Sequence, residues 1–315
     1  LGFISPVVAR MAAEHNLDLY AIEGRGRGGR ITKNDVLAYM EHQTAQPAAS
    51  QTPAAAEAPV PTPTPTPQPV AAAPPPPRAQ ATPGSLIPHS TVRRAIAEHM
   101  VQSKRTSPHV TTVMEVDLSR VVAHRQAHKT AFEREGVKLT FTPYFISAVV
   151  AALKAHPLVN ASWRDDGVYI HARINIGMAT SLGDEGLIVP VIKDAGQFSL
   201  AGLASIVNDL AERARARQLK PDEVKVGTFT ITNHGVSGSL FAMPIINQPQ
   251  CAILGVGVIQ KRVVVVSGPD GADSIAIRPM AYLSLTFDHR ILDGAAADHF
   301  LAKVVNRLQE WPQDD

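Results

Sequence analysis

The spacing of apolar residues divides the chain into two patterned parts, residues 1–43 and 86–315, with an unpatterned part between them. In the first part, apolar residues recur at three- and four-residue spacing behind a helix start at Ser5 and Pro6, and again after Thr32. This pattern predicts a small all-α domain of two short helices. Its inner faces consist of Val8, Met11, Ala12, Val36, Tyr39 and Met40.

The second part shows both helical and strand spacing. Helices are predicted at Val92–Ser103, Leu118–Glu135, Pro143–Ala155, Leu200–Gln218 and Ala295–Trp311. Strands are predicted at His109–Val116, Val168–Ile170, Ile174–Leu182, Leu187–Ile192, Thr228–Thr232, Ala252–Val266 and Met280–Phe287. Because these elements are interspersed without a strict βαβ order, we expect an α/β domain with a mixed sheet and helices that cover one face of it.

Residues 44–85 separate the two patterned parts. They hold 13 of the 25 prolines, many alanines, two charged residues and no aromatic residue, so they cannot form a core. The prolines favour polyproline II, which at ~3.1 Å per residue gives a flexible interdomain linker on the order of 100 Å long. A low-complexity loop within one domain is the alternative interpretation.

Composition narrows the function classes. The 30 Lys and Arg balance the 28 Asp and Glu to a net charge of +2, so the totals do not favour nucleic acid or an anionic membrane as a partner. The apolar runs are shorter than the ~20 residues of a membrane helix. The chain has one cysteine, Cys251, so it cannot form an internal disulfide. A protein without disulfides is compatible with a reducing compartment. We expect a cytoplasmic protein, with the mitochondrial matrix as the alternative.

The glycine-rich loop 24–29 matches the spacing G-x-G-x-x-G of dinucleotide sites. That fingerprint works only between a strand and a helix of a βαβ unit, and here a helix precedes the loop. The loop is instead basic, with Arg25, Arg27 and Arg30. It is either a solvated surface or a docking surface for an acidic patch on a partner protein.

Three segments of the larger part have the residue types of a catalytic site. Residues 288–294, Asp-His-Arg-Ile-Leu-Asp-Gly, bring a histidine to a strand end near a carboxylate, which suits a general base, although a surface histidine is the simpler reading. Residues 227–235 end a strand in hydroxyl and amide side chains that can donate to an oxyanion, or are ordinary edge residues. Residues 181–192 are a predicted hairpin, most simply structural.

Taken together, residues 228–233, 244–250, 252–255 and 288–294 resemble the catalytic domain of the dihydrolipoamide acyltransferases, the core components of 2-oxo acid dehydrogenase complexes. Residues 93–111 match the opening of that domain. Residues 1–43 resemble the family's peripheral subunit-binding domain, and the proline-rich part resembles its linkers. The resemblance implies domains 1–43, 44–85 and 86–315, and a chloramphenicol acetyltransferase-like fold for the last.

The resemblance implies acyl transfer between dihydrolipoamide and coenzyme A. His289 then accepts the proton of the attacking thiol, and Thr232 donates to the oxyanion of the tetrahedral intermediate, with Asn233 in support. Asp293 is expected to hold the His289 loop through an arginine, for which Arg94 is the candidate. The family's channel lies between subunits of a trimer, with His289 from one chain and Thr232 from its neighbour.

The same resemblance disfavours other chemistry. Cys251 lies in a predicted β run and is expected to be a buried structural residue rather than a nucleophile. His234, His289 and His299 lack the spacing and further ligands of a metal site, so no metal is expected.

The resemblance also implies partner proteins, although the chain differs from the family's pattern at some positions. Residues 1–43 are expected to bind dihydrolipoamide dehydrogenase or the 2-oxo acid decarboxylase component, although Ala9 and Ala13 stand where the family often has basic residues. The lipoyl group is expected on a domain that these residues do not contain. The C-terminal residues 311–315 differ from the family's leucine-rich tail, so a free trimer and a larger cubic or dodecahedral core both stay open. The basic residues expected to contact the partner are Arg10, Arg27, Arg30 and Lys33.

Two other functions stay open. One is a catalytically silent scaffold that binds a partner dehydrogenase, which the presence of His289, Asp293 and Thr232 disfavours. The other is a free-standing CoA-dependent acetyltransferase, which would not need residues 1–85. The acyl group, whether acetyl, succinyl or branched-chain, is not determined by these motifs.

Overall fold

The computed structural model describes residues 8, 22, 31, 35–36, 83–183 and 186–313, and the chain divides into two compact units, residues 1–79 and 80–315. In the first unit, Val8, Ile22, Ile31 and Val36 are buried, and Val8 and Val36 are helical. The prediction that Val8 and Val36 face inward is therefore confirmed. The linker prediction for residues 44–85 falls almost wholly outside the described residues and stays a prediction.

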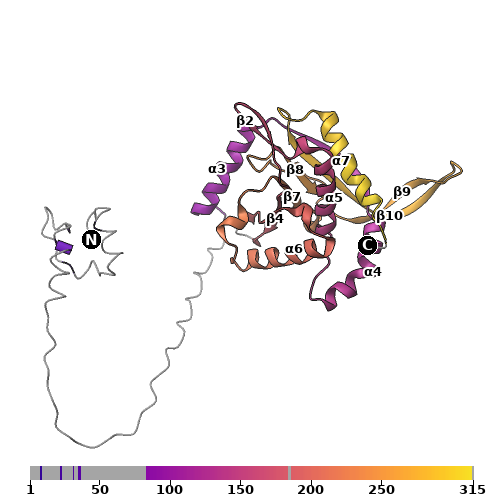
Figure 1. Ribbon diagram of the computed structural model, residues 1–315, viewed down its shortest axis with the longest axis horizontal. Helices are drawn as coiled ribbons and strands as arrows, with labels where there is room; N and C mark the ends of the chain where they lie inside the picture. The colour runs from indigo at the N-terminus through magenta and orange to yellow at the C-terminus, as the bar shows by residue number, and fades with distance from the viewer. Residues whose placement is uncertain are drawn as a thin grey trace, which may run out of the picture. The chain divides into compact units, whose positions relative to one another are not determined.

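The second unit is built on an eight-stranded mixed sheet (Figure 1). The order is β1-β10-β8-β7-β4-β5, with β6 paired to β4 and β9 to β10. β7 is parallel to β4 and β8, and the other pairings are antiparallel. The predicted mixed sheet is confirmed. The strands are β1 His109–Asp117, β4 Ile176–Ser181, β5 Leu187–Ile188, β6 Val191–Ile192, β7 Phe229–Asn233, β8 Ala252–Val256, β9 Gln260–Ser267 and β10 Asp273–Asp288.

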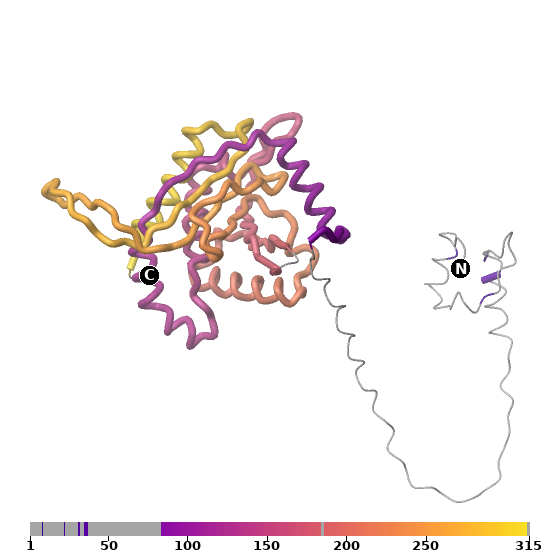
Figure 2. The backbone as a smooth tube through the Cα atoms, turned by 180° about the vertical axis from the view of Figure 1, so that it is seen from behind, coloured from indigo at the N-terminus to yellow at the C-terminus, as the bar shows by residue number. Residues whose placement is uncertain are grey.

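Five α-helices accompany the sheet, and α5 packs against both α6 and α7 (Figures 1 and 2). Nine of the fourteen residues of α5 are buried, so this helix is covered on most sides. The helices are α3 Thr91–Thr106, α4 Ser119–Arg134, α5 Thr142–Ala155, α6 Leu200–Arg215 and α7 Gly294–Gln309. Short 3₁₀ turns lie at Pro157–Val159, Ala195–Gln197, Pro221–Val224 and Gly235–Ser237.

A separate two-stranded sheet pairs β2, Ala161–Arg164, with β3, Gly167–Ile170. β2 was not predicted, because only two of its four residues are buried and the run is too short to show a period.

The two faces of the large sheet differ in chemistry. In β10, Leu283, Leu285 and Phe287 join the hydrophobic core, whereas the alternating Ser284 and Thr286 are buried on the opposite face. This alternation follows from the two-residue period of a strand. The polar face is where the hydroxyl-bearing residues of the central strands gather.

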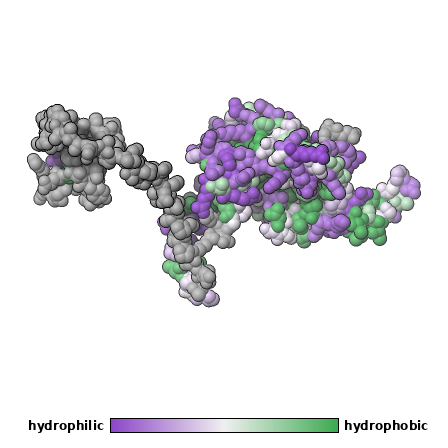
Figure 3. All heavy atoms as spheres, turned by 90° about the horizontal axis from the view of Figure 1, so that it is seen from below, coloured by the Kyte–Doolittle hydropathy of each residue, from purple (hydrophilic) through white to green (hydrophobic). Residues whose placement is uncertain are grey.

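A hairpin formed by β9 and the first half of β10 projects from the body of the second unit (Figures 1 and 2). Val263 pairs with Ile277 and Val265 with Ile275, and all four side chains are between 67% and 79% exposed. Figure 3 shows apolar residues gathered on this hairpin. We call these four residues the hairpin strip; an exposed apolar surface of this kind is typical of a contact region.

The predicted strand Ala252–Val266 is interrupted, which corrects the sequence-based expectation. The chain leaves β8 at Gly257, whose N–H donates to the carbonyl of Tyr282 at 2.9 Å, while Val258 N–H donates to Ser239 O at 2.9 Å. A Cβ at Gly257 would overlap the carbonyl of Leu240. The break therefore results from a tertiary contact that local sequence does not report.

We predict that Gly257→Ala lowers the free energy of unfolding by about 2 kcal/mol or more, since the added methyl group meets rigid backbone. Gly294→Ala is the matched control, because nothing lies within 4 Å of a Cβ there. It should leave stability unchanged or raise it by up to about 1 kcal/mol. Urea denaturation measures both; equal effects of the two substitutions would contradict the close approach.

Candidate active site

His289 lies immediately after β10, in the turn that leads to α7. Its backbone N–H donates to Pro108 O at 3.0 Å, and its ring lies 5.9 Å from that of Phe287. The side chain is exposed, and its imidazole has no hydrogen-bond partner within the described part of the chain. The backbone of His289 is thus fixed by a hydrogen bond, while the ring is free to accept a proton from a ligand.

The carboxylate of Asp288, the residue before His289, is buried and fully hydrogen-bonded. Asp288 is only 2% exposed and accepts hydrogen bonds from Ser107 Oγ at 2.6 Å, Arg290 Nη2 at 2.6 Å and Arg290 Nε at 3.0 Å. Burial alone would raise the pKa of Asp288, but the hydrogen bonds from Arg290 and Ser107 outweigh it and hold the pKa below its ordinary value. The charged carboxylate therefore ties the strand before His289 to the residue after it.

Two further contacts extend this network. Gln248 Nε2 donates to Ser107 Oγ at 2.8 Å, and the guanidinium of Arg290 lies 4.9 Å from the ring centre of Trp163 in β2. Sequence reasoning included Gln248 and Arg290 in matched segments without assigning them a role, and it missed Trp163. The signal available was the Asp-His-Arg triplet, in which a carboxylate and a guanidinium flank the histidine.

Asp293, the carboxylate predicted to hold the loop through an arginine, caps α7 instead. Its Oδ1 accepts the N–H of Ala296 at 2.8 Å, the ordinary role of an aspartate at an N-cap. No interaction among the described residues joins Asp293 to Arg94, which is exposed on α3. Within one chain, the arginine–carboxylate pair of this loop is Asp288 with Arg290.

Thr232 and Asn233 end β7, and both are half-buried. Asn233 Oδ1 accepts the N–H of Gly235 at 3.1 Å, which shapes the turn that follows. The Thr232 hydroxyl has no hydrogen-bond partner within the described residues. In the same turn, burial lowers the pKa of His234, so its imidazole is neutral near pH 7.

The register of the sheet separates Thr232 from His289. Thr232 is paired with Gly255 in β8, and Gly255 with Ser284 in β10. Asp288 is four residues beyond Ser284, which is roughly 13 Å along the strand, and β10 is two strands away, roughly 10 Å across the sheet. These lengths far exceed hydrogen-bond reach, so one chain does not bring the two groups to one reacting atom.

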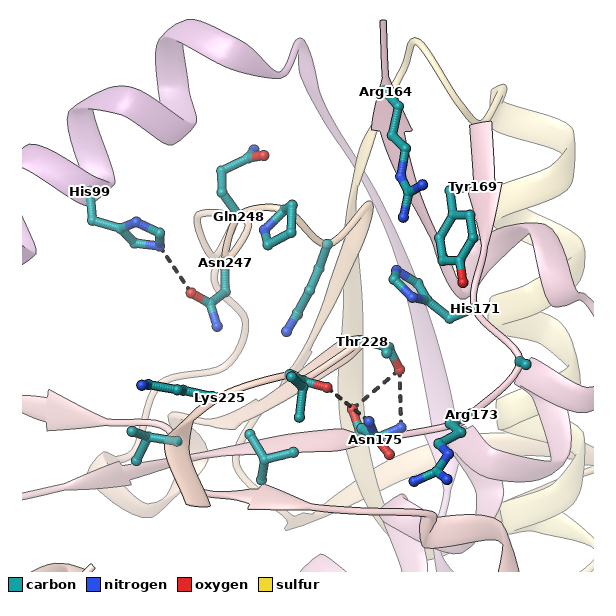
Figure 4. Close-up of a pocket in the computed structure, with 17 residues that line it drawn as sticks. His99, Arg164, Tyr169, His171, Arg173, Asn175, Lys225, Thr228, Asn247 and Gln248 are labelled. Carbon is teal, nitrogen blue, oxygen red and sulfur yellow. Dashed lines mark hydrogen bonds between the residues drawn. The ribbon is translucent and has the colours of Figure 1, made fainter. Parts of the chain in front are cut away.

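A pocket of about 830 Å³ is lined by residues of α3, of β2 and β3, and of the segments 224–228 and 247–250 (Figure 4). Arg164, Tyr169 and His171 project from one side, and His99 and Asn247 lie on the other. Gln248, which bonds to Ser107, also lines it. The pocket therefore shares a wall with the network around Asp288.

Other candidate groups have structural roles. Cys251 is buried, its thiol donates to Val159 O at 2.9 Å, and burial raises its pKa to about 12, so the prediction of a structural cysteine is confirmed. Within the described ranges, no group of three or more His, Cys, Asp or Glu is arranged to hold a metal ion, and no helix could span a bilayer. The predicted docking residues Arg10, Arg27, Arg30 and Lys33 lie outside the described residues.

Comparison with known families covers nearly the whole chain. The family described as 2-oxoacid dehydrogenases acyltransferase (catalytic domain) matches residues 82–313, and the e3 binding domain family matches residues 2–37. A dihydrolipoyllysine-residue acetyltransferase component of the pyruvate dehydrogenase complex from Mycobacterium tuberculosis is 45% identical over 311 residues, which cover 98% of this chain and 54% of that protein. The chain thus spans about half the length of that curated relative.

Solved structures agree with the family match. A probable dihydrolipoamide acetyltransferase from Listeria monocytogenes is 41% identical, with a TM-score of 0.70, over 75% of this chain and 98% of that one. A dihydrolipoamide acetyltransferase from Azotobacter vinelandii is 34% identical, with a TM-score of 0.68, over 72% of this chain and 91% of that one. In the Azotobacter enzyme, a serine, a histidine and an asparagine were investigated for their role in catalysis.

We predict that Asp288→Asn lowers the free energy of unfolding by roughly 3 kcal/mol, because the largely buried Arg290 keeps its charge without a carboxylate. Asp209→Asn removes one of the two carboxylate partners of Arg213 on α6 and leaves Glu223, so it should cost less than about 1 kcal/mol. Chemical denaturation at pH 7 compares them. Equal losses in the free energy of unfolding would contradict the proposed structural role of Asp288.

The stability of wild type relative to Asp288→Asn is also expected to depend on pH. Since the pKa of Asp288 is lowered in the folded state, its stabilisation is fully present above the ordinary aspartate pKa of ~3.9 and is lost as the pH falls through the lowered value. The stability difference between wild type and Asp288→Asn should therefore be constant from pH 5 to 7 and shrink below about pH 4. A difference that grows on acidification would refute this assignment.

Proposed function

Because the chain belongs to the family of 2-oxoacid dehydrogenase acyltransferases, we propose that it transfers an acyl group between the thiols of dihydrolipoamide and coenzyme A. The observation that carries this proposal is the exposed His289 imidazole, held on a fixed loop and without a partner in the described chain. A thiol of pKa ~8.5 is mostly protonated at neutral pH, so its attack on a thioester needs such a base.

His289 opens the reaction by accepting the proton of the attacking thiol. The resulting thiolate sulfur forms a bond to the thioester carbonyl carbon, and the carbonyl oxygen becomes an oxyanion. When the tetrahedral intermediate collapses, the bond to the original sulfur breaks, and His289 returns its proton to that leaving thiolate. No group is left on the protein, and the base is regenerated.

Thr232 is the proposed donor to the oxyanion. Its hydroxyl lies at the end of β7 and is not consumed by another hydrogen bond in the described chain. The serine and histidine investigated in the Azotobacter enzyme offer the same two groups, a hydroxyl and an imidazole. A preorganised donor of this kind is worth about 3 kcal/mol in the transition state.

The distance between these groups implies that the site is shared. Since His289 and Thr232 are far apart in one chain, we propose that His289 of one subunit acts with Thr232 of the next, in a trimer or a larger core. The hairpin strip supports association of chains, because its four exposed apolar residues would be buried by a neighbour.

Residues 2–37 are proposed to dock a partner enzyme of the complex, dihydrolipoamide dehydrogenase or the decarboxylase component. The basic residues Arg10, Arg27, Arg30 and Lys33 would contact acidic groups on that partner. Docking through a small module brings successive enzymes to one assembly.

The activity is tested with purified protein, dihydrolipoamide and acetyl-, succinyl- or branched acyl-CoA. We predict turnover with one of these, a loss of about 10²- to 10⁴-fold in kcat for His289→Ala, and about 10²-fold for Thr232→Ala with recovery in Thr232→Ser. Unfolding curves of the variants control for folding. Absence of turnover with all three acyl-CoAs, or an active His289→Ala, would contradict the proposal and favour a silent scaffold.

The docking proposal is tested on the full chain by binding to purified dihydrolipoamide dehydrogenase and to the decarboxylase component. We predict that the charge reversals Arg27→Glu and Arg30→Glu together weaken binding about tenfold or more, and that added salt weakens wild-type binding. Arg134→Glu, on α4, is the control and should bind as wild type. Binding that is insensitive to salt and to the double reversal would contradict a basic docking surface.

A further inference from the structure

On the polar face of the large sheet, one buried hydroxyl group differs from its neighbours. Thr286 Oγ1 in β10 lies 2.8 Å from Thr111 Oγ1 in β1, and Thr230 Oγ1 in β7 donates to Gln250 Oε1 at 2.6 Å. The hydroxyl of Ser284, two residues before Thr286, is completely buried but has no hydrogen-bond partner among the described residues. A buried hydroxyl is nearly always paired with protein or with an ordered water molecule. Ser284 therefore needs a partner that the described residues do not supply.

A second buried polar group without a partner lies close to Ser284. His234 follows β7, and its backbone N–H donates to Val256 O at 3.2 Å, which fixes the residue beside β8. Both ring nitrogens of His234 are shielded from solvent and lack a hydrogen-bond partner in the part of the chain that the structure describes. Two neighbouring polar groups in this state indicate a hydrogen-bond partner that they share.

Gly255 leaves the space between these two groups. It is paired with Ser284 on one side and with Thr232 on the other, so the three residues form one row across β10, β8 and β7 on one face of the sheet (Figure 1). A Cβ at Gly255 would overlap Ser284 Oγ and would lie 3.2 Å from His234 Nε2. One water molecule can bridge two polar atoms that are up to roughly 6 Å apart. Because both atoms border the same missing Cβ, they lie within that reach of each other.

Thr232 borders the same space from the side of β7. Adjacent strands are ~4.8 Å apart, so the Cβ of Thr232 is roughly 5 Å from the missing Cβ of Gly255. Its hydroxyl, the proposed oxyanion donor, is the third group here that has no hydrogen-bond partner within the described ranges. A water molecule in a protein interior needs about two to four polar partners, and the three groups supply that number.

The protonation state of His234 determines how such a water molecule is oriented. Burial lowers the pKa of His234, against a smaller opposing effect of the Ser239 backbone, so the ring is neutral near pH 7. A neutral imidazole has one nitrogen that accepts a hydrogen bond, whereas a protonated imidazole has none. With Nε2 as the acceptor, Ser284 can donate to the water oxygen, and the two water hydrogens can go to His234 Nε2 and Thr232 Oγ1.

We propose that one water molecule, held over Gly255 by Ser284 and His234, donates to Thr232 Oγ1, and that His234 and Ser284 are thereby positioning residues for the oxyanion donor. This inference rests on the proposed acyl transfer. Because the oxygen of Thr232 accepts from the water, its own hydrogen is directed away from the water and toward the thioester carbonyl oxygen. The hydroxyl is then oriented before the oxyanion forms, which is the preorganisation that makes such a donor effective.

Steady-state kinetics of the full chain tests the positioning role. We expect His234→Leu, which removes the acceptor but keeps a bulky side chain, to lower kcat about tenfold and to change KM less than about twofold. His234→Gln, whose amide can reach the position of Nε2, should recover most of kcat. His299→Leu, exposed on α7, is the control and should be as active as wild type. Unfolding curves show whether each variant is folded.

A double-mutant cycle separates positioning from a general structural effect. In a Thr232→Ala background, His234→Leu and Ser284→Ala should have almost no further effect on kcat, because the water molecule then has no hydroxyl to orient. An equal loss from His234→Leu in the wild-type and Thr232→Ala backgrounds would overturn the positioning role in an active enzyme.

A crystal structure of the full chain that resolves ordered water molecules gives a readout independent of turnover. We expect a water molecule within hydrogen-bond distance of Ser284 Oγ, His234 Nε2 and Thr232 Oγ1 in wild type, and its loss in His234→Leu. No ordered water at this position would overturn the proposal whatever the assay shows. If the water is present but wild type transfers no acyl group, the proposed function fails and the positioning role fails with it, while the water site stands.

Discussion

The register that aligns Thr232, Gly255 and Ser284 across β7, β8 and β10 is the constraint on which the rest of the structure depends. It is enforced by the alternation of faces, since a shift of one residue would turn Leu283 and Leu285 out of the core and Ser284 into it. With this register, the hydroxyl at the end of β7 and the imidazole beyond β10 lie toward opposite ends of the strands, because β10 runs antiparallel to β8 and β7. The proposed acyl transfer, which uses both groups, would then require two chains.

A second constraint fixes the histidine loop itself. Asp288 is buried with its charge intact because Ser107, at the end of α3, and Arg290, two residues further on, both donate to it. The intact pair contributes little net stability, but removal of one partner alone is costly because the other is left as an uncompensated charge. Through Gln248 the same network reaches the pocket of Figure 4, so hydrogen bonds connect the loop of His289 to a residue that lines this pocket.

Sequence reasoning predicted most of the fold because periodicity is a local property. The helices α3 to α7 and strands β1, β7 and β10 were found where apolar spacing is regular, although β10 extends well before its predicted start at Met280. It failed at Gly257, where the backbone of Leu240 ends a strand from a distance, and at the short β2.

The candidate site was predicted only in part, for a related reason. His289, Thr232 and Asn233 were identified from motifs, and their positions at strand ends could be expected. That Asp293 caps a helix while Asp288 holds the arginine was not anticipated, although both carboxylates were visible in the motif. The link from Gln248 to Ser107 joins residues far apart in sequence and could not be read from it.

Complementation between two inactive variants tests the shared site most directly. Chains with His289→Ala and chains with Thr232→Ala are unfolded, mixed and reassembled together. The site between two neighbouring subunits is intact when one subunit retains His289 and the next retains Thr232. Random mixing in a closed ring makes about a quarter of these sites intact, so about a quarter of wild-type activity should return. Mixed assemblies no more active than the two parent variants would contradict the account.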